Sequence, residues 1–295
     1  ADNTKTYDTL KDRLDEEYTE VTTQLADTAK EMTMSKNELK MDVDNTYYSV
    51  ISKNETPITK ELDFKILAPL DNNTFNYGSL NDGNIKGSNP TYERCFYRKG
   101  LKFESDEVVE IPYNVDEIKE GTMFVRFKPL IDFNDSLDMF YNLIRIDDAN
   151  GVEIAYIQLD YTDLRGYNGV SVYIRGEDNR RTRFPLNLNK DEVHSIAFKW
   201  FYSETENEGS MTVYFDGKII VSTHFENKHI PKNSHMIRIG NQSSQNRPAQ
   251  SVIEDVFFTD KSLPTSSILR LHRYPLKVEA VFNPNIYIPE TPVKN

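Results

Sequence analysis

Cysteine is almost absent: Cys95 is the only one in 295 residues, so no disulfide can form within the chain. Proteins that fold in a reducing compartment generally lack disulfides, and this composition therefore favours synthesis in a cytoplasm. Long apolar runs are also missing, since no segment approaches the ~18 residues that a membrane-spanning helix needs. The first residues show no charged segment followed by an apolar one, so we expect neither a secretion signal nor membrane insertion.

Positive charge is in deficit. Lysine and arginine total 35 against 47 aspartates and glutamates, which gives a formal net charge of −12. Nucleic acids and anionic membranes are bound through clustered positive charge, so we exclude both as the main partner. Hydrophobic residues amount to 38% of the chain, which is enough for a sizeable core in one large domain or two smaller ones.

Residues 1–45 contain neither glycine nor proline, and residues 1–50 are predicted to form a helix. Apolar positions recur at steps of three and four, with one extra four-residue step between Leu14 and Tyr18, a pattern typical of a coiled coil with a stutter. The apolar stripe is too narrow for a helix that packs into a globular core. The alternative is a single helix packed on its own downstream domain. We predict a homo-oligomer, guessed to be a trimer, that forms through Leu10, Leu14, Tyr18, Val21, Leu25, Met32 and Leu39.

From Thr56 onward, short apolar or aromatic runs alternate with Gly, Asn, Asp and Pro. This texture, without helical stretches between the runs, predicts an antiparallel sandwich or jelly roll. Asp216-Gly217 predicts a two-residue hairpin turn, because a type I′ turn needs positive φ at both positions, and Asp148–Gly151 predicts another turn. Residues 276–295 contain Pro284, Pro289 and Pro292, and we expect an extended tail that forms no central strand.

Seven fragments of this region resemble, in the expected order, the laminin-G-like or concanavalin A-like lectin/glucanase superfamily. The resemblance covers about residues 62–275 and implies a mainly β, jelly-roll domain over residues 56–275, although Val193 stands where the pattern usually has tryptophan. The fragments are Leu67–Asp71, Gly100–Glu104 with Val109–Pro112, Gly121–Pro129, Val193–Trp200, Val213–Lys218, Ile237–Gly240 and Ile253–Phe258.

An enzyme on this fold would need a pair of carboxylates. Retaining glycosidases of the superfamily carry a Glu-x-Asp-x-x-Glu pattern, which points acids ~5.5 Å apart into one groove. No such pattern occurs in this chain. Glu254 and Asp255 are adjacent and are predicted to lie on opposite strand faces, and Asp147-Asp148 is predicted to lie in a turn. With Trp200 as the only tryptophan to stack on a sugar, we expect no enzymatic activity.

Metal and nucleophile motifs are also missing. The five histidines lack the spacing of a helical zinc site, and we interpret them as structural or surface residues: His194, His224, His229, His235 and His272. No Gly-x-Ser-x-Gly turn or phosphate-binding glycine loop occurs. We therefore expect no cofactor. Calcium binding stays a possibility, because oxygens that it could use are offered by Asp71, Asn81, Asp82 and Asp255. The alternative is that these residues only form turns, in which Asp and Asn are common.

Ligand recognition on such sandwiches uses aromatic faces and planar polar side chains. The segment 160–169 supplies both, and we predict that it forms a contact surface through Tyr161, Arg165, Tyr167 and Asn168. The alternative is that its tyrosines are half-buried at strand ends. Asn241–Arg247 is a second polar loop. Arg180–Arg183 is predicted to form a solvated hairpin tip, or to pair with an acidic neighbouring subunit.

A coiled coil followed by a lectin-like sandwich would build a multivalent fibre, in which identical heads raise weak binding by avidity. This architecture resembles phage virion appendages such as tail-fibre, baseplate or neck proteins. It implies a non-enzymatic virion protein, assembled in the bacterial cytoplasm, that binds host-surface polysaccharide or other virion proteins. The alternatives are a cellular adhesin or carbohydrate-binding module, a glycoside hydrolase, and a purely architectural part that binds no sugar.

Overall fold

The computed structural model describes residues 64–68, 70, 76, 79–133, 139–161, 169–175, 180–226 and 231–273. The predicted N-terminal coiled coil, with all seven of its seam residues, and the tail at 276–295 lie outside this part of the chain. Three of the predicted contact residues, Arg165, Tyr167 and Asn168, lie outside it as well.

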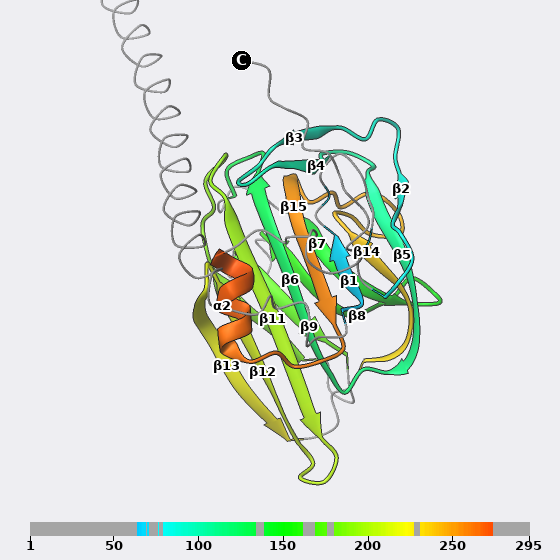
Figure 1. Cartoon of the computed structure of the whole chain (residues 1–295), viewed down its shortest axis with the longest axis vertical. Helices are drawn as coiled ribbons and strands as arrows, with labels where there is room; N and C mark the ends of the chain where they lie inside the picture. Colours follow the sequence, from blue (N-terminus) through cyan, green and yellow to red (C-terminus); the bar gives the residue numbers. More distant parts are fainter. Residues whose placement is uncertain are drawn as a thin grey trace, which may run out of the picture. The chain divides into compact units, whose positions relative to one another are not determined.

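Two antiparallel sheets form a sandwich (Figure 1). The eight-stranded sheet has the order β13 (Lys218–Glu226), β12 (Glu208–Phe215), β11 (His194–Ser203), β6 (Glu120–Pro129), β15 (Ser251–Thr259), β4 (Lys99–Phe103) and β3 (Tyr92–Arg94), with β1 (Ile66–Ala68) also paired with β15. The seven-stranded sheet has the order β10 (Arg180–Pro185), β9 (Gly169–Ile174), β8 (Glu153–Asp160), β7 (Phe140–Asp148), β14 (Lys232–Ile239), β5 (Val108–Glu117) and β2 (Asn84–Lys86).

The predicted mainly β, antiparallel sandwich is confirmed. The predicted hairpin at Asp216-Gly217 joins β12 to β13 with φ values of 46° and 75°. The turn at Asp148–Gly151 joins β7 to β8. The consecutive strands β7 to β10 form a meander on one side of the seven-stranded sheet.

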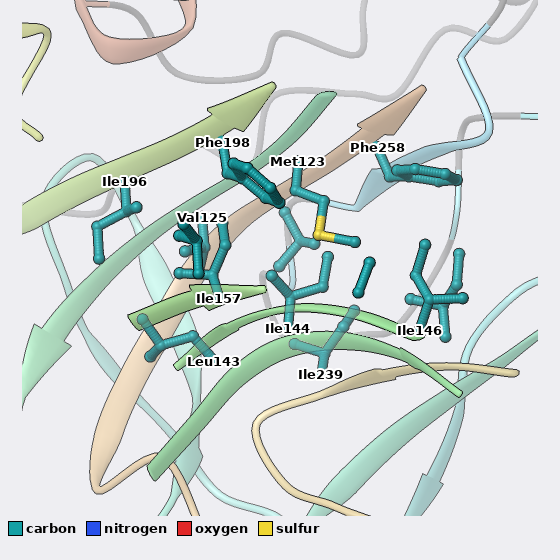
Figure 2. Close-up of a cluster of buried hydrophobic side chains, with 14 of the residues drawn as sticks. Met123, Val125, Leu143, Ile144, Ile146, Ile157, Ile196, Phe198, Ile239 and Phe258 are labelled. Atoms are coloured by element: carbon teal, nitrogen blue, oxygen red, sulfur yellow. The ribbon is translucent and has the colours of Figure 1, made fainter. Parts of the chain in front are cut away.

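Apolar side chains from both sheets fill the space between them (Figure 2). Met123, Val125 and Phe198 come from the eight-stranded sheet and face Ile144 and Ile157 of the other. Each strand contributes alternate residues, because successive side chains of a strand point to opposite faces. The apolar half of each strand is thereby removed from water, and the other half is left on an outer face.

One helix, α2 (Thr265–Arg273), was not anticipated from the sequence. In Figure 1 it lies across the outer face of the eight-stranded sheet. That face carries apolar side chains, and α2 covers them in a second cluster formed by Phe64, Phe124, Ala197, Tyr214, Phe257, Leu263, Ile268 and Leu271. The helix is only nine residues long and buries just Ile268 and Leu271, so its sequence pattern is weak. No helix in the described ranges is long and apolar enough to cross a membrane.

The packing of the two sheets makes a stability prediction. Ile157 is fully buried between the sheets, whereas Ile219 on β13 is 55% exposed. We expect Ile157→Ala to lower the free energy of unfolding by about 3 kcal/mol, since it leaves a cavity, and Ile219→Ala to change it by less than about 0.5 kcal/mol. Urea denaturation of both variants measures the difference. Equal losses would contradict this core.

Candidate functional site

The outer face of the seven-stranded sheet is polar. On β9, Val170, Val172 and Ile174 point into the core, so the alternating Ser171 and Tyr173 point outward. The same alternation operates on β8 and β10, and on β7 a bulge interrupts it once, because Leu143 and Ile144 both lie in the core. We call the outward set the polar face and define it as Glu110, Asn142, Arg145, Asp147, Tyr156, Gln158, Asp160, Ser171, Tyr173, Arg181, Arg183 and Arg238.

Strand register aligns these residues in two rows. One row runs across six strands through the directly opposed residues Glu110, Arg238, Arg145, Tyr156, Tyr173 and Arg181. A second, shorter row runs through Asn142, Gln158, Ser171 and Arg183. Directly opposed side chains in a sheet are close enough to interact. Most of the members are buried, with Asn142 and Ser171 fully so.

At the β5 side of the polar face, charges are paired. Arg145 Nε donates to Asp147 Oδ1 at 2.6 Å, and Arg238 bonds both Asp147 and Glu110, the latter at 2.8 Å. Burial raises the pKa of Asp147, and the two arginines oppose that shift. The prediction that Asp147 lies in a turn is wrong: it belongs to β7, where Arg145 and Arg238 compensate its burial.

At the β10 side, one arginine lies over a pair of stacked tyrosines and a second arginine pairs with an aspartate. The rings of Tyr156 and Tyr173 are 5.1 Å apart with an interplanar angle of 23°. The Arg181 guanidinium lies over both, 5.7 Å and 5.5 Å from their centroids, and Arg183 Nε donates to Asp160 Oδ2 at 2.6 Å. The predicted solvated hairpin tip is therefore wrong: Arg180–Arg183 lies in strand β10, and the Arg181 and Arg183 side chains are half-buried against β8 and β9.

Several buried polar atoms of this face have no hydrogen-bond partner. They are Asn142 Nδ2 and Oδ1, the Tyr156 hydroxyl, Ser171 Oγ, Arg181 Nε and Arg183 Nη2. Buried polar atoms are normally paired, and each unpaired one costs about 1–3 kcal/mol. Here they lie on four consecutive strands and on one face, which leaves a set of unused donors and acceptors. Burial raises the pKa of Tyr156 to about 12, although an interaction with the neighbouring Ser171 hydroxyl opposes the shift, so the Tyr156 hydroxyl keeps its proton at neutral pH.

Tyr161 differs from the expectation that placed it on a contact surface. It is fully buried, its ring stacks on Phe133 at 5.3 Å, and its hydroxyl donates to the Leu186 carbonyl at 2.6 Å. Tyr161 follows β8 at a position where the alternation points inward. In this structure it is a core residue, so Tyr161 fits neither the predicted contact surface nor the alternative of a half-buried tyrosine at a strand end.

The second polar loop, Asn241–Arg247, lies beside the polar face. The Arg247 guanidinium lies 4.9 Å from the centroid of the Phe140 ring at the start of β7. The loop is held by Asn241, whose Oδ1 accepts from the backbone N–H groups of Gln242 and Arg247, both at 2.9 Å. Sequence reasoning therefore identified a loop next to the face but missed the face itself.

The acidic pair Glu254-Asp255 also differs from expectation. A β-bulge between Ile253 and Asp255 interrupts the alternation, so the prediction of opposite faces fails, and both carboxylates reach Arg98. Glu254 accepts three backbone N–H bonds from residues 96–98, at 2.5–3.2 Å. Asp255 binds the Arg98 and Arg126 guanidinium groups at 2.9 Å and 3.2 Å.

This cluster joins the sheet to α2. Arg126, on β6, bonds Asp255 and also donates to the carbonyls of Leu271 and His272 at 2.7 Å and 3.2 Å. The end of α2 thus receives a cation, which the carbonyls of a helix C-terminus favour. The carboxylates of Glu254 and Asp255 are both buried and accept hydrogen bonds. Their role in this structure is to hold α2 against the sheet.

Three histidines make local hydrogen bonds that agree with a structural role. His194 pairs with Asp216 at 2.9 Å, and His272 with the Ser195 hydroxyl at 2.7 Å. His235 pairs with Asn114, also at 2.9 Å. In the described ranges no group of three or more His, Cys, Asp or Glu side chains is placed to hold a metal ion.

Comparisons with known proteins support the fold alone. No family model matches the sequence, and no curated protein matches it. Among solved structures, domain 4 of AbnA, a GH43 extracellular arabinanase from Geobacillus stearothermophilus, in complex with arabinotriose, is similar over 72% of this chain and 100% of its own, with a TM-score of 0.53 and 14% identity. The receptor-binding domain of botulinum neurotoxin D is similar over 71% of this chain, with a TM-score of 0.51 and 14% identity.

The chain spans 52% of that neurotoxin domain and 51% of the receptor-binding domain of botulinum neurotoxin type G, which has a TM-score of 0.50 and 10% identity. At these identities the similarity shows the fold alone: a β-sandwich of the kind found in these binding domains.

The buried acidic cluster predicts a pH dependence of stability. Burial and the neighbouring Asp255 raise the pKa of Glu254 to about 7, above its unfolded value. Between about pH 4.5 and pH 7 the folded state therefore holds a proton that the unfolded state has released. The stabilisation is complete below about pH 4.5 and is lost as the pH rises through 7, so we expect the free energy of unfolding to fall by roughly 1–3 kcal/mol over this window.

Chemical denaturation at a series of pH values measures this slope. The glutamine of Glu254→Gln carries no charge at any of these pH values, so the variant should flatten the slope of unfolding free energy against pH. Its amide nitrogen replaces one oxygen acceptor, which lowers stability at every pH. Glu206→Gln, at an exposed position, should retain the wild-type slope. A Glu254→Gln variant with an unchanged slope would contradict the assignment.

Proposed function

We propose that this protein is a non-enzymatic glycan-binding module that uses the polar face of its seven-stranded sheet. The observation that carries the proposal is the set of buried, unpartnered donors and acceptors on β7 to β10: Asn142, Tyr156, Ser171, Arg181 and Arg183. A polyhydroxylated ligand offers both donors and acceptors, so it would satisfy hydroxyl, amide and guanidinium groups in one binding event. It would first contact Arg181 and Arg183, which are half-buried at the β10 edge, and it would reach Asn142, Tyr156 and Ser171, which are at most 1% exposed, only if the face opens.

The occupied acidic pairs support a role without catalysis. The carboxylates of Asp147, Glu254 and Asp255 each contact arginines or backbone N–H groups. Glycoside hydrolysis needs one carboxylic acid and one carboxylate on either side of a bound sugar. The unoccupied groups on the polar face are hydroxyl, amide and guanidinium groups, which orient a ligand but do not supply that acid pair.

We further propose that the protein works as an oligomeric phage virion appendage, with the polar face directed at host-surface polysaccharide. The basis is the heptad-like seam of residues 1–50, which would bring several identical sandwiches together. Linked copies raise the apparent affinity of a weak site through effective concentration. Arg165, Tyr167 and Asn168 follow β8 in the chain and remain part of the proposed contact surface. The protein would be found in the virion.

Two tyrosines on opposite outer faces provide a matched test of the glycan site. The Tyr156 hydroxyl is unpartnered on the polar face, whereas the Tyr214 hydroxyl bonds Thr265 Oγ1 at 2.9 Å beneath α2. We expect Tyr156→Phe to weaken glycan binding about tenfold while leaving stability unchanged or higher, because it removes an unsatisfied buried group. Tyr214→Phe should lower stability by about 1 kcal/mol and leave binding unchanged.

Glycan-array binding and urea denaturation of both variants provide the two readouts. Wild-type protein that binds no glycan would contradict the proposal and favour the purely architectural alternative. Equal effects of the two substitutions on binding would show that the sandwich as a whole, rather than its polar face, is required.

The oligomer is tested separately. Replacing Leu14, Val21 and Leu25 with Asp places charges in the predicted seam, where burial of an unpaired charge is unfavourable. We expect the mass measured by light scattering to fall to that of a monomer while the β-type circular dichroism is retained. An unchanged mass would mean that the helix packs on its own chain.

A further inference from the structure

Arg181 stands apart from the other cations of the polar face. Arg183 is paired with Asp160, Arg145 with Asp147 and Glu153, and Arg238 with Glu110 and Asp147. Arg181 has no carboxylate within ion-pair distance in the described part of the chain. In that part of the chain its guanidinium contacts the two tyrosine rings. The polar face therefore carries one cation in excess.

The surroundings hold this cation in place. Its guanidinium lies over the stacked rings of Tyr156 and Tyr173, which attract it through their π faces and remove water from one side. Its Nε–H is buried without an acceptor. A half-buried guanidinium without a counter-ion is unfavourable, and an oxyanion is the group that matches its fork of donors.

Neutral polar groups lie next to the cation. The Tyr156 and Ser171 hydroxyls lie close enough to interact with each other but form no well-aligned hydrogen bond. The Nη2 of the neighbouring Arg183 has no acceptor, while its Nε holds Asp160. The Tyr156 hydroxyl is neutral across the physiological range. One positive charge beside several neutral donors matches a ligand with one negative group and several hydroxyls. That combination describes an acidic sugar better than a carboxylate-rich peptide.

We propose that the β10 side of the polar face recognises an acidic sugar residue, with its oxyanion on Arg181 and its hydroxyls on Tyr156 and Ser171. This inference rests on the proposed glycan-binding function and narrows its ligand class. The oxyanion is a carboxylate or a sugar-linked phosphate, since both fit a guanidinium. The net charge of −12 is compatible, because a single unpaired arginine on an acidic protein favours isolated anionic groups over densely charged polyanions.

The experiment uses the full chain and a glycan array in which each carboxylated oligosaccharide stands beside its carboxyl-reduced form, and each phosphorylated one beside its dephosphorylated form. We expect wild-type protein to bind one acidic series at least about tenfold more tightly than its neutral counterparts. The preferred series distinguishes carboxylate from phosphate. Raising the salt concentration should reduce the preference, since the arginine is half-exposed.

Three variants locate the effect. Arg181→Gln should abolish the preference, so that the acidic and the neutral form of each glycan bind equally tightly. Arg181→Lys should retain part of it, because the charge remains but the planar fork is lost. The matched control is Arg175→Gln, which removes an arginine just after β9 that already pairs with Asp148 at 3.2 Å, and it should keep the full preference.

The possible results separate the two proposals. Equal binding of acidic and neutral glycans by the wild type would overturn the acidic-sugar inference and leave glycan binding intact. No binding to any glycan would overturn the proposed function itself. A lower oligomer mass for Arg181→Gln, seen by light scattering, would identify the counter-ion as a carboxylate of another protein copy and would also overturn the inference.

Discussion

Burial of apolar side chains between the two sheets is the constraint on which the rest of this structure depends. Side chains alternate along a strand, and on β9 Val170, Val172 and Ile174 point into the core. Ser171 and Tyr173 therefore point to the outer face. The same holds on β8 and β10, and on β7 apart from one bulge at Leu143 and Ile144. The candidate site is thus a consequence of the hydrophobic core, since the strands that fill the core also align the polar rows.

The outer faces of the two sheets differ in polarity and in how their side chains are stabilised. The eight-stranded sheet has apolar outward residues such as Phe124 and Phe257, and α2 covers them. Arg126 and Asp255 then connect the sheet to the end of that helix. On the seven-stranded sheet the outward residues are charged, amide or hydroxyl side chains, and ion pairs compensate the burial of the charged ones except Arg181. The groups left over on β7 to β10 are those for which a ligand is the simplest physical explanation.

Much of the fold could be predicted from sequence, because period-two alternation and turn chemistry are local signals. The hairpin at Asp216-Gly217 is an example, since the preference for positive φ belongs to those two residues. The errors arose where long-range contacts override a local signal. A bulge shifted Glu254 and Asp255 out of alternation, and α2 was missed because its few apolar residues gain meaning only against the sheet that they cover.

The sequence by itself determined the composition of the core, the antiparallel strand pattern and the absence of a glycosidase carboxylate motif, because each is carried by residues close together in the chain. Only the tertiary structure decided that Arg181, on the strand expected to be a solvated tip, lies over Tyr156 and Tyr173 from two other strands. Cross-strand register sets such neighbours, and register depends on how whole strands pair and which face they bury, which no short stretch of sequence encodes.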